Sequence, residues 1–186
     1  MSKHVKLFDE HIDYEEYINT LDAVIPRVSY CKDNHDVHYN PKETKITAIF
    51  NILGSGRSNI LGKYLQNEIQ ELEINGTIVP SSDLDWTVDG FGKYYFDEGG
   101  EYVIKYTLNT PTEVPMDIFS DLTQVISVKI PMSITIINAN AFKNCINLEF
   151  VKIPPSVITI DTNAFQNCKK LISIGGLNSG SSIELP

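Results

Sequence analysis

The side chains best suited to covalent chemistry are two cysteines, Cys145 and Cys168. A catalytic thiol occurs once and needs a positioned base. These two thiols instead stand at equivalent places in two copies of a repeated segment, and no histidine follows His38 in the chain. We interpret both cysteines as reduced plugs of the core, because three cysteines, with Cys31 far away, are also too scattered for a disulfide scaffold. We expect no catalytic residue.

The four histidines, His4, His11, His35 and His38, offer a metal site as the alternative chemistry. His35 and His38, with Asp33 and Asp36 beside them, combine imidazole and carboxylate groups that suit Zn²⁺. However, Val37-His38-Tyr39 is typical of a strand, and residues three apart on a strand point to opposite faces. Polar surface near a turn is therefore the favoured interpretation, and we expect no metal and no cofactor.

Two further segments have residue types that occur in phosphate-binding and calcium-binding sites. Gly54-Ser55-Gly56-Arg57-Ser58-Asn59 is rich in glycine but lacks the Gly-Lys-Ser/Thr ending of a phosphate loop, so we predict a mobile hairpin loop. Asp83, Asp85 and Asp89 have the oxygen ligands that Ca²⁺ prefers, but aspartate-rich turns are common without metal. Since no carboxylate pair has the pattern of a glycosidase either, we expect that the protein is not an enzyme.

The element that would position such residues near the C-terminus is a 23-residue repeat. Lys129–Val151 and Lys152–Ile174 are identical at 11 of 23 aligned positions, and Tyr106–Val128 aligns as a degenerate first copy. In each copy, short β-branched pieces ending in proline predict strands. The following Asn-Ala-Phe-Xaa-Asn-Cys run predicts a tight turn or one helical turn whose Phe and Cys fill the interior. Because one coil buries its apolar side only against the next, the repeats predict a short solenoid.

The repeats resemble the BspA-like leucine-rich repeat. The hallmark residues are Ile130-Pro131, Ala141-Phe142, Asn144-Cys145 and Leu148, followed by Ile153-Pro154, Ala164-Phe165, Asn167-Cys168 and Leu171. The resemblance implies an interaction scaffold rather than a catalyst, of the kind found in surface proteins, adhesins and phage-encoded proteins.

The segment 42–108 predicts a small β-sandwich of five or more short strands. The period-two pattern of Ile46–Ile52 predicts a strand, and Asn75-Gly76 predicts a tight hairpin. A second turn at Asp89-Gly90 is expected between strands at Trp86–Val88 and Tyr94–Phe96. A long strand at 101–108 would place Tyr102, Ile104 and Tyr106 on one face. The stretch Tyr95–Tyr106 resembles the last hairpin of bacterial immunoglobulin-like modules.

The segment 1–41 differs from both parts. Tyr14, Tyr17 and Ile18 are spaced for one side of a short helix, and extended segments follow at Val24–Tyr30 and Val37–Tyr39. The pattern resembles the leader of virion structural proteins in phages of Bacteroides-type hosts, which implies a docking segment. The expected fold is thus mainly β, with an extended or short-helical docking segment at 1–41, an immunoglobulin-like sandwich at 42–108 and leucine-rich repeats at 109–186.

Charge and composition narrow the function. The 186 residues carry a net charge of -9, and this acidity disfavours binding to nucleic acid or to anionic lipid. The repeats contribute almost none of the net charge. No apolar run is long enough to span a bilayer, and no secretory signal follows Met1, so we expect no membrane insertion. We expect a homo-oligomeric virion component, assembled in the host cytoplasm, that binds other virion proteins through 1–41 and a host surface or glycan through the repeats. The alternative is a bacterial surface adhesin whose export signal has been removed.

Overall fold

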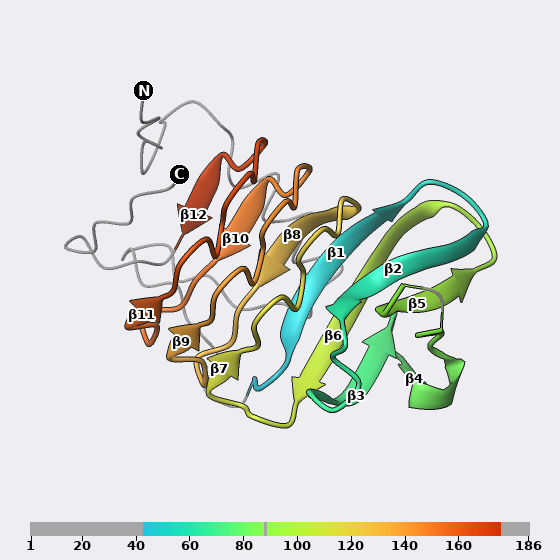
Figure 1. Cartoon of the computed structure of the whole chain (residues 1–186), viewed down its shortest axis with the longest axis horizontal. Coiled ribbons are helices and arrows are strands. Elements are labelled where there is room, and N and C mark those ends of the chain that lie inside the picture. The colour runs from blue at the N-terminus through green and yellow to red at the C-terminus, as the bar shows by residue number, and fades with distance from the viewer. Residues whose placement is uncertain (1–42, 88, 176–186) are drawn as a thin grey trace, which may run out of the picture.

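The computed structural model describes residues 43–87 and 89–175, whose regular secondary structure consists of β-strands and one short 3-10 turn (Figure 1). The described elements are β1 (Ile46–Ile52), β2 (Gly56–Lys63), β3 (Ile69–Ile74), β4 (Thr77–Val79), a 3-10 turn (Ser81–Asp83), β5 (Phe91–Phe96), β6 (Gly100–Leu108), β7 (Glu113–Val114), β8 (Val125–Lys129), β9 (Ile136–Ile137), β10 (Phe150–Lys152), β11 (Thr159–Ile160) and β12 (Ser173–Gly175). The prediction of a mainly β fold is confirmed. The docking segment 1–41, with its four histidines and Cys31, lies outside the described residues.

Within the described residues, seven strands form one sheet in the order β12-β10-β8-β1-β6-β3-β4. The strands β12, β10 and β8 run parallel to one another, whereas every later pair in that order is antiparallel. Figure 1 shows this sheet crossing the molecule from the repeats to the segment 46–108. The sheet is therefore shared by the two parts that the sequence distinguishes.

The strands of 46–108 follow their sequence patterns. Along β1, Ile46, Ala48 and Phe50 are fully buried on the face that the period-two pattern predicts, but Thr47 and Ile49 on the other face are also buried, at 2% and 8% exposed. The hairpin at Asn75-Gly76 joins β3 to β4, and both residues have positive φ, 47° and 84°, which is the backbone of a type I′ turn. The long strand is β6, with Ile104 and Tyr106 buried on the predicted face.

Two local predictions in this part are wrong. Gly54 does not lie in a hairpin loop, because β1 belongs to the seven-stranded sheet whereas β2 pairs with β5 in a separate two-stranded sheet. Trp86 and Thr87 do not form a strand. The Asp85 carboxylate accepts hydrogen bonds from the Thr87 amide at 2.9 Å and from the Thr87 hydroxyl at 2.6 Å, and this local turn replaces the strand ladder.

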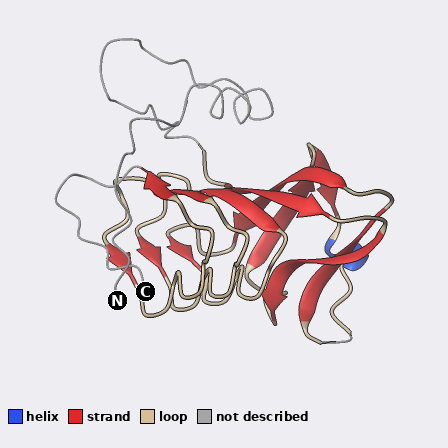
Figure 2. Cartoon of the chain, turned by 90° about the horizontal axis from the view of Figure 1, so that it is seen from above, coloured by secondary structure: helices blue, strands red, loops and turns tan. Residues whose placement is uncertain are grey.

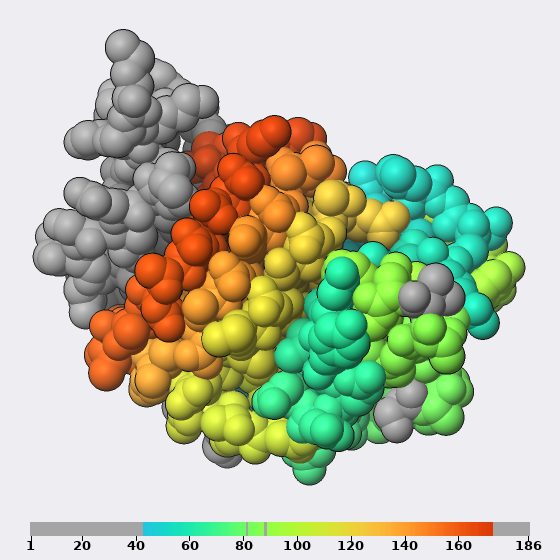
Figure 3. Space-filling view, viewed as in Figure 1, coloured from blue at the N-terminus to red at the C-terminus, as the bar shows by residue number. Residues whose placement is uncertain are grey.

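Successive repeats stack in a constant register, one full copy apart. Phe150 of β10 lies opposite Ser127 of β8 and Ser173 of β12, and the second sheet, β11-β9-β7, shows the same offset. The degenerate first copy is confirmed, because β7 and β8 belong to it and pair in register with the second copy. In Figure 2 the turns of successive coils project side by side, and in Figure 3 the coils form parallel bands.

An aromatic column runs through the coils. The rings of Phe119 and Phe142 stack with centroids 5.2 Å apart, and those of Phe142 and Phe165 stack 5.0 Å apart with an interplanar angle of 2°. Tyr106 of β6 extends the column with an edge contact to Phe119 at 5.4 Å. The predicted role of the repeat phenylalanines as interior plugs is thus confirmed, and the column begins at the first residue of the degenerate first copy.

The repeat turns need residues that tolerate a left-handed backbone. Positive φ values occur in two sets that follow the spacing of the repeat, at Asp117, Asn140 and Asn163 and again at Asp121, Asn144 and Asn167. Asparagine and aspartate adopt this conformation more readily than other non-glycine residues. The Asn144 side chain also donates a hydrogen bond to Asp121 at 2.7 Å and accepts one from Asn167 at 2.8 Å. The Asn-Ala-Phe-Xaa-Asn-Cys run is therefore a turn rather than a helical turn.

The repeats and the segment 46–108 share one hydrophobic core. β1 pairs antiparallel with β8, and the Gly62 amide of β2 donates a hydrogen bond to the Ile118 carbonyl at 2.8 Å. A Cβ atom on residue 62 would overlap the carbonyl oxygen of Asp117, so only glycine allows this approach. The immunoglobulin-like arrangement of 42–108 and the boundary at residue 108 stay predictions.

Candidate functional site

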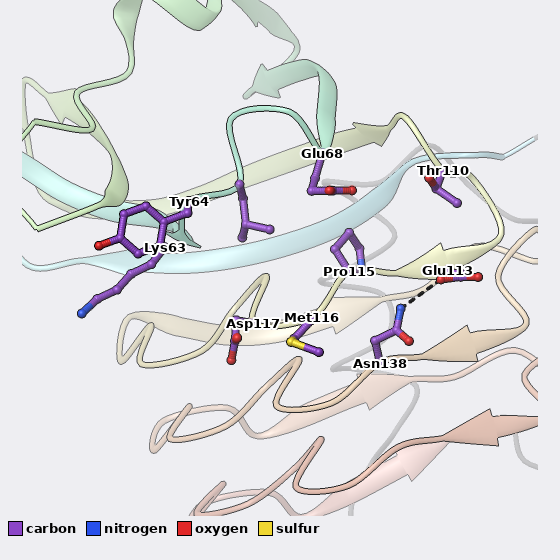
Figure 4. A pocket seen from close by; sticks show the side chains of 10 residues that line it. Lys63, Tyr64, Glu68, Thr110, Glu113, Pro115, Met116, Asp117 and Asn138 are labelled. Atoms are coloured by element: carbon purple, nitrogen blue, oxygen red, sulfur yellow. Dashed lines mark hydrogen bonds between the residues drawn. The ribbon is translucent and has the colours of Figure 1, made fainter.

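A cleft of about 400 Å³ lies where the β2–β3 connection meets the first coil of the repeats (Figure 4). We call it the junction cleft. Its lining comes from both parts of the chain, from Lys63, Tyr64, Leu65 and Glu68 in one part and from Thr110, Glu113, Pro115, Met116, Asp117 and Asn138 in the repeats. The Gly62 contact lies beside the cleft and is one of the contacts that hold the two parts together, with the β1–β8 pairing.

Tyr64 at one end of the cleft has an unusual backbone. Its φ is +62°, which is sterically costly for a residue with a large side chain. Its amide donates a hydrogen bond to the Gly90 carbonyl at 3.0 Å, and its ring lies so close to Gly90 that a Cβ there would come within 2.8 Å of the ring. The residue nevertheless remains 75% exposed. The fold thus presents an aromatic ring at the surface, beside Gly90.

The repeat side of the cleft is polar and well ordered by hydrogen bonds. Asn138 donates to the Glu113 carboxylate at 3.1 Å, a contact drawn in Figure 4. The Asp117 amide donates to the Ala139 carbonyl at 3.3 Å, which fixes the turn that carries the exposed Met116. The cleft therefore combines carboxylates, an amide, a hydroxyl and a lysine with two exposed apolar side chains.

This set of groups suits a ligand rich in hydroxyls. Carboxylates accept several hydrogen bonds each, amides both accept and donate them, and an aromatic ring offers a flat apolar surface. Among the described residues, no three His, Cys, Asp or Glu side chains gather as metal ligands.

The Cys145 side chain is fully buried as predicted, whereas Cys168, in the last coil, is only partly buried. The Cys145 thiol donates to the Phe119 carbonyl at 2.9 Å, and the Cys168 thiol donates to the Phe142 carbonyl at 3.1 Å. Burial raises the pKa of Cys145 well above its ordinary value and raises the pKa of Cys168 to about 12. Because the thiolate is the reactive form, both side chains are poor nucleophiles at neutral pH.

The raised pKa values of the two thiols predict a loss of stability in alkali. The folded chain keeps the Cys168 proton up to a pKa of about 12, whereas the unfolded chain releases it near the ordinary value of 9.0. Stability is therefore intact below pH 9 and falls as the pH rises towards 12, by up to ~1.4 kcal/mol per pH unit for each such group. Cys168→Ser should flatten this fall in denaturant titrations between pH 8 and 11. An unchanged pH dependence would show that the thiol is not buried.

The three aspartates considered as calcium ligands form local hydrogen bonds and ion pairs instead. Asp85 pairs with Arg57 at 2.6 Å, and Asp89 pairs with Lys93 at 2.9 Å. Hydrogen bonds from Thr87 lower the pKa of Asp85, and a hydrogen bond from Lys93 lowers the pKa of Asp89. Asp83 accepts a hydrogen bond from the Ser82 hydroxyl at 3.2 Å. His35 and His38 lie outside the described residues.

Sequence reasoning missed the junction cleft. Its lining residues are scattered from Lys63 to Asn138 and include no motif. One signal was present, because Asp117 aligns with Asn140 and Asn163 and so marks a turn of the first coil.

The parallel coils, their constant register and the aromatic column define a repeat protein of the leucine-rich type. Residues 84–184, more than half of the chain, match the family described as BspA type leucine rich repeat region (6 copies). The chain belongs to this family. The match begins at residue 84, upstream of the first repeat copy predicted from the sequence.

Searches of the curated proteins and of the solved structures found no match. No helix in the described part of the chain is long and apolar enough to cross a membrane.

Proposed function

We propose that this protein is a non-enzymatic interaction protein that binds a glycan in the junction cleft. The family supports an interaction or adhesive role, since BspA-type leucine-rich repeats are a scaffold for contacts. The observation that supports a glycan ligand is the exposed ring of Tyr64. The backbone of this residue has a costly conformation, and polar side chains from both parts of the chain lie beside it. Strained residues tend to be retained at functional sites, where the surrounding structure compensates for their cost.

The cleft has the groups that a sugar needs. Glu68, Glu113 and Asn138 can form hydrogen bonds with several hydroxyls, while Tyr64 and Met116 can contact the apolar face of a sugar ring. A rigid scaffold limits the ordering cost of binding, and here the aromatic column and the shared sheet supply that rigidity.

Replacing Tyr64 by asparagine tests this proposal. Asparagine tolerates a positive φ, so Tyr64→Asn removes the ring without adding backbone strain. Loss of the ring contact, about 1.4 kcal/mol, should weaken glycan binding ~10-fold in isothermal titration, with little change in melting temperature. Tyr95→Asn is the matched control, because Tyr95 is also exposed, at 57%, but does not line the cleft. Equal affinities of the two variants would contradict the proposal.

We propose that the protein is a component of a phage virion. It forms a homo-oligomer there, and residues 1–41 attach it to other virion proteins. The support is the sequence pattern of those residues, which resembles virion leaders. In this arrangement the repeats and the cleft point away from the particle towards the host surface. Mass spectrometry of purified virions should find the protein there. Its recovery in bacterial envelope fractions and not in virions would favour the alternative, a cell-surface adhesin.

A further inference from the structure

The seven-stranded sheet has a second face that points away from the hydrophobic core. We call it the outer face and define it by Thr47, Ile49, Val103, Ser127 and Lys129. These residues form two rows across the strands: Thr47 lies opposite Lys129, and Ile49 lies opposite both Val103 and Ser127. Alternation along β1 sends their side chains to the opposite side from the buried Ala48 and Phe50.

The outer face is more buried than a bare sheet face should be. Thr47 is 2% exposed, Ser127 7%, Ile49 8% and Val103 9%, yet neither Ile49 nor Val103 belongs to the hydrophobic core cluster. Ile78 of β4, which lies opposite Glu73 at the edge of the same sheet, is 61% exposed. The Thr47 hydroxyl is also buried without a hydrogen-bond partner among the described residues. The middle of the outer face therefore has the burial of a covered surface.

The chain enters the described structure at this face. The Glu43 carboxylate binds the Lys129 side chain at 2.6 Å, shortly before β1 begins at Ile46. The segment 1–42 would span up to ~140 Å when extended, whereas seven strands cover only ~30 Å. The preceding segment is thus long enough to cross the whole face.

The composition of the segment complements the face. Residues 1–42 contain eight carboxylates and five basic side chains, and they include apolar residues such as Tyr14, Tyr17 and Ile18. The face offers Ile49 and Val103 for apolar contact and Lys129 for a carboxylate, the bond that Glu43 already makes. We propose that residues 1–42 of the same chain pack on the outer face of the sheet. The face is then an intrachain docking site, and it is independent of the junction cleft.

Carbodiimide cross-linking of the full chain tests this proposal, because it joins lysines only to carboxylates in contact with them. Mass spectrometry should find links to carboxylates between Asp9 and Asp36 from Lys129 and from Lys105, which lies opposite Thr47 on β6. Lys143, Lys169 and Lys170, in the repeat turns, serve as the control and should give few such links. Mixing unlabelled and ¹⁵N-labelled chains separates links within a chain from links between chains. Equal linking of the control lysines, or links only between chains, which would indicate a second copy, would overturn the proposal.

Thiol labelling provides a second measurement. In a Cys31→Ser background, Ile49→Cys should react with a maleimide at least ~10-fold more slowly than Ile78→Cys on the same sheet, because its reaction requires the covering segment to open. Equal rates would also overturn the proposal. Neither measurement involves glycan binding, so failure here is distinguishable from failure of the proposed function.

Discussion

Phe142→Ala is expected to lower the free energy of unfolding by about 3–5 kcal/mol in denaturant titrations. Phe142 is fully buried, and it is the only ring of the described aromatic column that stacks face to face on both sides, on Phe119 and on Phe165. Its removal leaves a cavity that the coils cannot close, because their backbones are held in register by hydrogen bonds such as that from the Phe142 amide to the Ala164 carbonyl, 2.8 Å.

Two variants control for this effect. Phe142→Leu keeps most of the volume and should cost less than Phe142→Ala. Tyr95→Ala removes an exposed ring and should change stability by less than ~0.5 kcal/mol. A surface-like loss for Phe142→Ala would contradict the stacked-coil structure.

Gly62→Ala should be the most disruptive small substitution, with an expected loss of about 3 kcal/mol. The new methyl group would overlap the Asp117 carbonyl oxygen, and relief of that overlap would break the hydrogen bond from the Gly62 amide to Ile118. Because this contact joins β2 to the first coil, the substitution should also open the junction cleft. We expect Gly62→Ala to lower the melting temperature and to weaken glycan binding together.

Gly54→Ala is the matched control for Gly62→Ala. A Cβ atom at residue 54 meets no atom within 4 Å, so this substitution should leave stability within ~0.5 kcal/mol of the parent. If Gly62→Ala were equally harmless, that result would contradict the close approach of Gly62 to the backbone of Asp117 and Ile118.

The repeats could be predicted well from the sequence because each copy repeats the same local physics. The equivalent pairs Phe142 and Phe165, and Cys145 and Cys168, mark interior positions in the sequence itself, and even the degenerate copy is visible through Phe119 and Leu122. The left-handed turns are explained by the asparagines at fixed spacing.

The pairing of distant strands could not be predicted in the same way. The period-two pattern of β1 indicated its buried face but not its neighbours, β6 and β8, which lie far from it in the sequence. The alternation of apolar and polar residues predicts which side chains of a strand are buried, but it does not predict which strand pairs with it in the sheet. The strand expected at Trp86–Val88 failed for a local reason, since a single carboxylate, Asp85, formed a competing turn.

The junction cleft was beyond sequence reasoning because it depends on that pairing. Tyr64 and Asn138 are brought to one cleft only when β2 packs on the first coil. No residue type in the cleft is unusual by itself, and the strained φ of Tyr64 is a property of the fold.

The most direct test of the central claim is an NMR titration of the ¹⁵N-labelled full chain with a panel of bacterial capsular polysaccharides, lipopolysaccharide O-chains and peptidoglycan fragments. If the junction cleft binds a glycan, at least one member of the panel should shift the amide signals of Tyr64, Glu68, Glu113 and Asn138. Tyr64→Asn should reduce the shifts at the three other residues at the same glycan concentration and require a higher concentration to reach them. Shifts confined to other surfaces, or none with any member of the panel, would contradict the claim.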